Sequence, residues 1–285
     1  MSRNSEDRRA RRRAVENDRV QQLGLRVVGP DADESELALV RVQYRATGRI
    51  IDALGLTPDG VLQVGANAAT LANGIVARKS LEVIQNACSA GCAWCCVLEI
   101  SAWPAEVLQL AAWLESRNAP ADIELLVSRL RECVEERDVE NAAGRVPKVV
   151  CPLLAADRTC SVYDARPAAC AAGMASDVGP CKAYAEGADD DAGGFISAPA
   201  VGVPAHVSAE VIAERGGPSL VGTGAAIDLH TGLATALREG AIATTSLWMA
   251  GADVFREARD RLMRRREILA ALGPREERFL HRSRS

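Results

Sequence analysis

Residues 88–96 read Cys-Ser-Ala-Gly-Cys-Ala-Trp-Cys-Cys, so that four cysteines occur within nine positions. A protein that uses cysteine only as a small buried hydrophobic residue has no need to group its thiols in this way. Two or three residues between cysteines allow successive thiolates to turn toward one ion, and Gly91 can adopt the positive φ that such a loop often needs. This stretch therefore predicts a metal site, and we interpret the rest of the chain as its scaffold.

The doublet at the end of this stretch constrains the site further. Cys95 and Cys96 are adjacent, and the side chains of neighbouring residues tend to point apart. The doublet therefore favours two neighbouring centres, or one ligand beside a cysteine that is not a ligand.

Four more cysteines follow at wider spacing, between residues 151 and 181. Together the two groups are enough for two tetrahedral four-sulfur sites, for a four-iron cluster plus another centre, or for a binuclear site with shared sulfurs. The spacing does not choose among these arrangements. The candidate ligands are Cys88, Cys92, Cys95, Cys96, Cys151, Cys160, Cys170 and Cys181.

The segment that carries the second group, residues 143–183, contains several prolines and glycines and is predicted to be irregular. Residues 148–150 and 160–163 are expected to form two short strands of a small hairpin, with its turn at 156–158. Such a segment has little core of its own, so bound metal would supply the missing cross-links.

Several thiolates in a partly buried site need nearby positive charge or hydrogen-bond donors. Arg166 lies between two candidate ligands and is followed by a proline that stiffens its turn, and the Tyr163 hydroxyl can donate to sulfur. We expect Tyr163, Asp164 and Arg166 to surround the site. The alternative interpretation is a surface ion pair between Arg166 and Asp164.

These motifs resemble a known family. Three motifs occur in order: CSAGCAWCC at 88–96, CPLL at 151–154 and CSVYDARPAAC at 160–170. Together they resemble the YkgJ-type or CxxCxxCC family of zinc- or iron-chelating proteins, to which flagellin lysine N-methylases are related. The resemblance covers about residues 88–181, implies the same eight cysteines as metal ligands and leaves Cys133 outside. The chain departs from the family pattern by three residues in the first gap, where two are typical, and by Ala171, where an arginine often stands.

The fold is predicted to be mostly α, with a helical scaffold around an irregular cysteine-rich lobe. Apolar residues at helical spacing, ended by proline and glycine signals, are the basis for this prediction. On one of these helices Cys133 lies on the apolar stripe, which indicates a core residue. Helices are expected over residues 36–54, 61–84, 104–117, 121–139, 208–214, 225–238 and 246–272.

Four segments are expected along the chain. Residues 1–35 are interpreted as a mobile charged arm, and residues 36–185 as helices with the metal-binding cysteines. Residues 186–195 are expected to be an acidic, glycine-rich linker, and residues 196–285 a helical region that packs on the same domain.

Composition restricts the class of protein. With 285 residues, 48% of them hydrophobic, the chain can bury a core without disulfides, and nine cysteines is an odd number for a closed disulfide framework. No uncharged apolar stretch is long enough for a membrane span, so we expect a cytoplasmic protein without a membrane partner. The net charge of −4, and basic runs that are not interleaved with aromatics, argue against nucleic acid as a partner. A protein partner is left open.

We therefore expect a cytoplasmic protein that binds zinc or an iron–sulfur centre through eight cysteines. The alternatives are a lysine N-methyltransferase or a redox enzyme that uses the centre, and a thiol redox sensor based on the doublet. Whether the protein is an enzyme stays open, because residues 220–228 resemble a glycine loop for a cofactor only superficially. His206, His230 and His281 lack metal-ligand spacing, and we interpret His230 as a polar or core residue rather than as a base for a cysteine.

Overall fold

The computed structural model describes residues 3–82, 87–88, 91–175, 177–187, 195–197, 199–219 and 224–272. Within these ranges the protein is mostly α, as predicted, and the strands are only two or three residues long. None of the helices in these ranges is both long and apolar enough to cross a membrane.

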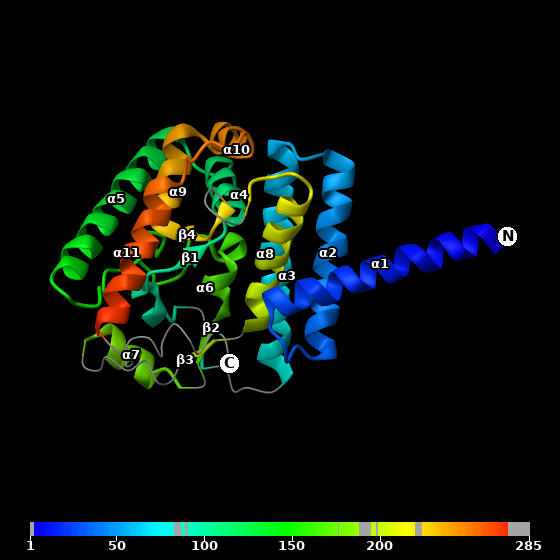
Figure 1. Ribbon diagram of the computed structural model, residues 1–285. Coiled ribbons are helices and arrows are strands. Elements are labelled where there is room, and N and C mark those ends of the chain that lie inside the picture. Colours follow the sequence, from blue (N-terminus) through cyan, green and yellow to red (C-terminus); the bar gives the residue numbers. More distant parts are fainter. Residues whose placement is uncertain are drawn as a thin grey trace.

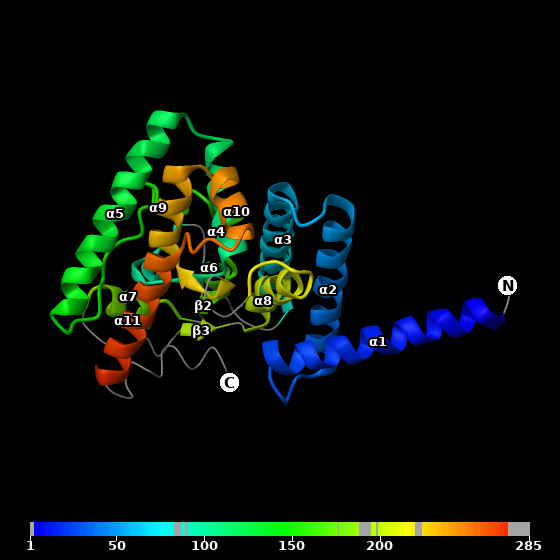
Figure 2. The same cartoon turned by 45° about the horizontal axis from the view of Figure 1, so that its top comes forward.

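One side of the molecule consists of three helices that pack together: α2 (Glu34–Leu54), α3 (Pro58–Glu82) and α8 (Pro199–Glu214) (Figures 1 and 2). A capping box begins α2, because the Asp33 carboxylate accepts the Glu36 amide and the Glu36 carboxylate accepts the Asp33 amide. Gly55, with φ of 72°, ends this helix. The predicted helix at 36–54 is therefore confirmed.

Helix α1 (Arg3–Val27) precedes this group and projects from it (Figure 1). Its C-terminal part packs on the body, because Val20 and Leu23 are buried in the core and Arg26 forms an ion pair of 3.0 Å with Glu210. The packed structure therefore starts before residue 36. The sequence expectation gave too little weight to these two apolar residues at the end of a charged segment.

The other side contains α4 (Pro104–Glu115), α5 (Pro120–Ala142), α9 (Leu229–Glu239), α10 (Ala241–Met249) and α11 (Arg256–Leu272). Helix α9 packs against α4, α5 and α11, and Figure 1 shows it on the same side of the molecule as α5 and α11. Prolines begin α4 and α5, where the missing N–H costs no helical hydrogen bond. Both helices lie where the sequence predicted them.

Two short antiparallel strand pairs join distant parts of the chain. Strand β1 (Ser101–Ala102) pairs with β4 (Ile227–Asp228), with Ser101 opposite Asp228. Strand β2 (Gly173–Ala175) pairs with β3 (Phe195–Ser197). Because β4 leads directly into α9, the first pair fixes the start of α9 beside β1.

A single large apolar cluster reaches from α1 and α2 to α9 and α11. It includes Leu153, Val162 and Ala165 of the irregular region between α5 and α7 (Gly179–Ala185). The side chains of three cysteines pack against it, namely Cys151, Cys160 and Cys170. These three cysteines of the second group therefore pack directly against the core.

The segment around this group differs from the predicted hairpin. Residues 148–150 are described and are not a strand; pairing begins only after Cys151, with one bridge between Leu154 and Cys160. The chain then continues in the 3-10 helix η2 (Tyr163–Ala165) and in α6 (Ala168–Ala172). The local β pattern was correct in placing a turn at 156–158 but wrong in the extent of the strands.

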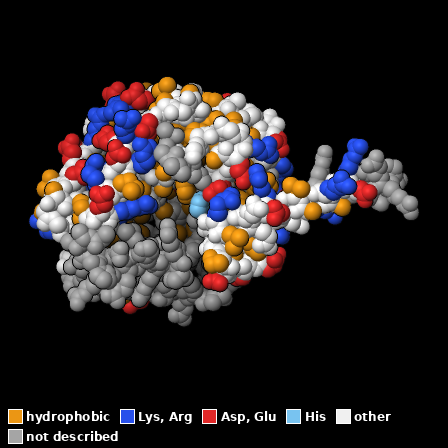
Figure 3. Space-filling model, in the orientation of Figure 1, with side chains coloured by type: hydrophobic (Ala, Val, Ile, Leu, Met, Phe, Trp, Pro, Cys, Tyr) orange, Lys and Arg blue, Asp and Glu red, His pale blue; other side chains and the backbone are white. Residues whose placement is uncertain are grey.

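Three of the later predicted elements also differ. Helix α8 begins nine residues earlier than predicted and contains Pro204. The helix expected at 225–238 starts with β4, and the one expected at 246–272 is divided into α10 and α11. Most of the proposed linker at 186–195, and residues 220–223 of the glycine loop at 220–228, lie outside the described residues. Figure 3 shows acidic and basic side chains interspersed on the face drawn there.

Candidate metal centre

The first cysteine group lies where the 3-10 helix η1 (Trp94–Val97) meets α7. Gly91 has a φ of 84°, as the loop was expected to require. Cys181 of α7 is buried, and its pKa is raised to about 11 by burial and by the negative charges of Cys88, Cys95 and Cys92. These four sulfurs therefore share one neighbourhood, although α7 is far along the chain from the loop.

The doublet lies inside η1, and its two thiols contact each other. Cys96 donates a hydrogen bond to the sulfur of Cys95, which lowers the pKa of Cys95 and raises that of Cys96. The two neighbouring thiols therefore interact, whereas the sequence argument had neighbouring side chains pointing apart. Cys95 also interacts with Arg166, whose positive charge lowers its pKa further.

The second group comes to the doublet through the backbone. The Cys151 amide donates to the Cys96 carbonyl at 2.7 Å, which joins the two groups directly. The thiolate charges of Cys151 and Cys170 help to raise the pKa of Cys96. Burial raises the pKa of Cys170 well above its ordinary value, and the charges of Cys151 and Cys160 raise it further.

Most of the electrostatic interactions between the thiols fall within two sets of four, and those between the sets all involve Cys95. Cys95 interacts with members of both sets, so the sets adjoin at the doublet. One set is Cys88, Cys92, Cys95 and Cys181, and the other is Cys96, Cys151, Cys160 and Cys170.

The described residues contain no three His, Cys, Asp or Glu side chains that are already grouped as tightly as metal binding requires. The thiols instead interact in pairs through hydrogen bonds, Cys88 with Cys92 and Cys95 with Cys96. The chemistry of the donors fits zinc or iron, because thiolate is the preferred ligand of both zinc sites and iron–sulfur clusters.

Backbone amides also point at three of the sulfurs. The Leu153 amide donates to Cys151, and the Val162 amide donates to Cys160, in each case from two residues farther along the chain. The Ala175 amide of β2 donates to Cys88. Donors of this kind lower the pKa of a thiol and stabilise its thiolate, which is the form that binds metal.

Arg166 is held against this region from two sides. Its Nε donates to the Asn73 side chain of α3 at 3.2 Å, and its guanidinium lies 4.0 Å from the centre of the Tyr163 ring. Asn73 also donates to the Asp164 carbonyl. Among the described residues Arg166 forms no ion pair with Asp164, so its charge is directed at Cys95, Cys160 and Cys170.

Glu106 of α4 determines the position of α6, which carries Cys170. Its carboxylate is fully buried and accepts the Ala168 amide at 2.7 Å and the Trp103 amide at 3.0 Å. Burial raises the pKa of this carboxyl above its ordinary value, and the two amide bonds act in the opposite direction. The sequence gave no sign of this role.

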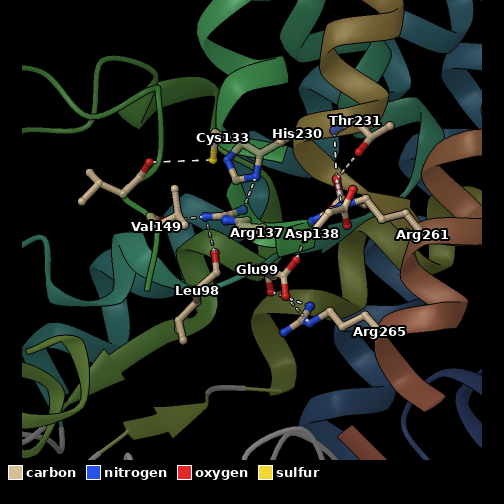
Figure 4. A network of polar contacts seen from close by, with 12 residues as sticks. Leu98, Glu99, Cys133, Arg137, Asp138, Val149, His230, Thr231, Arg261 and Arg265 are labelled. Carbon is tan, nitrogen blue, oxygen red and sulfur yellow. Dashed lines mark hydrogen bonds and ion pairs between the residues drawn. The ribbon is translucent and has the colours of Figure 1, made fainter. Parts of the chain in front are cut away.

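His230 of α9 is a buried residue, as the sequence analysis predicted, but the sequence did not indicate its neighbours. Its Nε2 lies 3.3 Å from the sulfur of Cys151, 79 residues away in sequence. Its Nδ1 lies 2.7 Å from an Nη atom of Arg137, whose other contacts include the Leu98 and Val149 carbonyls (Figure 4). Burial and the neighbouring positive charge of Arg137 hold the pKa of His230 far below its usual range, so the ring is neutral.

Cys133 is a buried core residue, as its position on the apolar stripe predicted. Its thiol donates to the Val150 carbonyl at 3.8 Å, next to Cys151 (Figure 4). Burial raises its pKa, which keeps it a neutral thiol.

The cysteine-rich region also matches a known family. Residues 87–190 match the model of the CxxCxxCC family, described as "Putative zinc- or iron-chelating domain". This region is a CxxCxxCC domain. Its matched range contains all eight candidate cysteines, and it ends before α8. No curated protein and no solved structure matches the chain.

Proposed function

We propose that the CxxCxxCC domain holds two zinc or iron centres, each bound by one of the two sets of cysteines. The observation that carries the proposal is the electrostatic interaction of eight thiols that come from Cys88 and Cys92 before η1, from η1 itself, from Cys151 and Cys160, and from α6 and α7, with amide donors aimed at three of them. Thiols that pack only as small hydrophobic groups need no such donors.

The chain's residues would hold the metals as follows. Cys88, Cys92, Cys95 and Cys181 would form the centre between η1 and α7. Cys96, Cys151, Cys160 and Cys170 would form the second, and Arg166 would offset part of its negative charge. Four sulfurs around each zinc leave no open position, so zinc would cross-link the lobe, whereas iron in the same ligands would transfer electrons.

The cellular role that follows is a cytoplasmic metal-binding protein. Thiolate sites of this kind are stable in a reducing compartment, and the chain uses nine cysteines without a disulfide among the described residues. The methyltransferase alternative receives no support from residues 220–228, of which four lie outside the described ranges.

The test is metal analysis of the full-length protein purified without oxygen, together with its acid-labile sulfide and visible spectrum. Zinc without sulfide, or iron with sulfide and a brown colour, would identify the centre. Protein that folds with all eight thiols titratable and no bound metal would refute the proposal.

Single substitutions test the division into two sets. Cys181→Ala and Cys160→Ala should each lose one set's metal and keep the other, and the double variant should lose both. Cys133→Ala is the matched control and should keep the full metal content, because its thiol bonds only to a carbonyl in the described structure. Loss of all metal in either single variant would instead indicate one shared cluster.

A further inference from the structure

The ring of His230 is held between a sulfur and a guanidinium. His230 lies in the first turn of α9, and both of its ring nitrogens have close partners. Nε2 lies 3.3 Å from the Cys151 sulfur, and Nδ1 lies 2.7 Å from an Nη atom of Arg137. Arg137 is completely buried and does not move freely, because its second Nη atom donates to the Val149 carbonyl at 2.9 Å and to the Leu98 carbonyl at 3.4 Å (Figure 4).

The chemistry of arginine decides which ring nitrogen carries the proton. A guanidinium has five N–H donors and no acceptor, so the contact at 2.7 Å requires Nδ1 to accept. In a neutral imidazole the proton must then be on Nε2. A doubly protonated ring would place an N–H directly against the guanidinium. The remaining donor, Nε2–H, therefore points at the sulfur of Cys151.

This polarity is the reverse of that found at a metal-binding histidine. A ligating histidine offers a lone pair to the metal and donates its other ring N–H to a carboxylate, carbonyl or water. Here Nε2 has no free lone pair, and Nδ1 faces a donor instead of an acceptor. A distance of 3.3 Å alone would suit either role, so Arg137 is the residue that distinguishes them.

We propose that His230 is a positioning residue of the cysteine centre, which donates Nε2–H to the sulfur of Cys151, and that Arg137 prevents it from becoming a metal ligand. The role toward a metal rests on the proposed function, in which Cys151 is a ligand. An N–H···S bond withdraws electron density from a thiolate, so it makes a zinc-bound sulfur less nucleophilic and favours the reduced state of an iron centre.

The direct test reads the ring tautomer by NMR in full-length protein labelled with ¹⁵N-histidine. Two-bond ¹H–¹⁵N spectra distinguish the two nitrogens, and a His230→Gln variant assigns the signals among the three histidines. We expect Nε2 protonated and Nδ1 unprotonated, both in the reduced metal-free protein and after loading with Zn²⁺. A protonated Nδ1 together with a metal-shifted Nε2 would overturn the proposal, because it would make His230 a ligand.

Zinc content measured on the same sample keeps the two proposals separate. Absence of bound zinc and iron would refute the metal-binding function, while the tautomer of the metal-free protein would still decide the hydrogen bond. Bound zinc with the wrong tautomer would refute only the role of His230.

A second measurement uses Co²⁺ as an optical probe. His230→Leu should keep the cobalt stoichiometry and shift the sulfur-to-cobalt charge-transfer band to lower energy, because Cys151 becomes a better electron donor. His206→Leu is the matched control for the loss of a histidine, since His206 stacks on the Trp103 ring, and it should leave the band unchanged. Loss of about one bound cobalt in His230→Leu, or an unshifted band, would contradict the proposal.

Discussion

The buried carboxylate of Glu106 connects the helical scaffold to the candidate site through its hydrogen bonds. The carboxylate joins α4 to the first residue of α6, two residues before Cys170. In Glu106→Ala the buried Ala168 amide and the partly buried Trp103 amide both lose their acceptor. An unsatisfied buried donor costs about 1–3 kcal/mol, and the small cavity adds about 1 kcal/mol.

The cost of burying the carboxylate acts against these losses. Burial raises the pKa of Glu106, so its removal returns part of the desolvation energy. We therefore expect Glu106→Ala to lower the free energy of unfolding by about 2–4 kcal/mol. Glu106→Gln, which keeps one acceptor oxygen and places an NH₂ group against the second amide, should lose about half as much.

The assay is urea unfolding of metal-free reduced protein, followed by a Co²⁺ titration of each folded variant. Because α6 carries Cys170, Glu106→Ala should also weaken binding at the set of sulfurs that includes Cys170. An unfolding free energy within about 0.5 kcal/mol of the parent protein would refute the structural reasoning. Unchanged cobalt binding would refute the link from Glu106 to the site.

The remaining predictions concern packing, a buried ion cluster and pH. Gly65→Ala should destabilise the protein by about 1–3 kcal/mol in thermal or urea unfolding, because the added Cβ would lie 2.5 Å from the Ala105 carbonyl oxygen. Gly74→Ala on the same helix is the control: its Cβ would meet nothing within 4 Å, so this change should stabilise the protein by up to about 1 kcal/mol. Arg261→Met should cost about 3–5 kcal/mol by the same measurements, since buried acidic groups lose their partner. The pKa of Glu106 is raised in the folded state, so its contribution to stability is full below its unfolded pKa and is lost as pH rises through its folded pKa. In Glu106→Gln, the free energy of unfolding measured at a series of pH values should therefore lose this decrease between the two pKa values.

The sequence predicted those parts of the fold whose signals are local. Helices α2, α4 and α5 have periodic apolar faces and begin or end at proline or glycine, so their positions follow from about twenty residues each. The eight clustered cysteines were visible for the same reason, and their role as metal ligands stays a prediction. The two sets could not be derived, because Cys181 reaches the first group only through the packing of α7 on η1.

Other features depend on contacts between residues that are distant in sequence. Strands of two residues, such as β1 and β4, have no periodicity to detect, and their pairing joins residues 101 and 228. His230 and Arg137 contact each other over 93 positions, and neither belongs to a motif. A neutral histidine on an apolar helix face is therefore indistinguishable, in sequence, from one that faces a cysteine.

The buried ion cluster beside β1 and β4 explains how this histidine is held in place. Arg261 of α11 contacts the carboxylates of Glu99 and Asp228, and Figure 4 shows Arg265 approaching Glu99 from the same helix. Buried ion pairs contribute little net stability, because desolvation offsets their attraction. This cluster, however, joins three segments at one point: Glu99, two residues before β1, the last residue of β4, and α11.

Asp228 also caps α9, since its carboxylate accepts the Thr231 amide and hydroxyl, and the next amide, that of Leu229, donates to the Ile100 carbonyl. His230 therefore lies two residues after Asp228, which takes part in a strand pair, a helix cap and an ion pair. A shift of β4 would move the ring away from Cys151, so the charges of the cluster act mainly on the geometry of the N–H···S contact. Arg261→Met should accordingly disturb the His230 tautomer signal even in solution conditions where the protein remains folded.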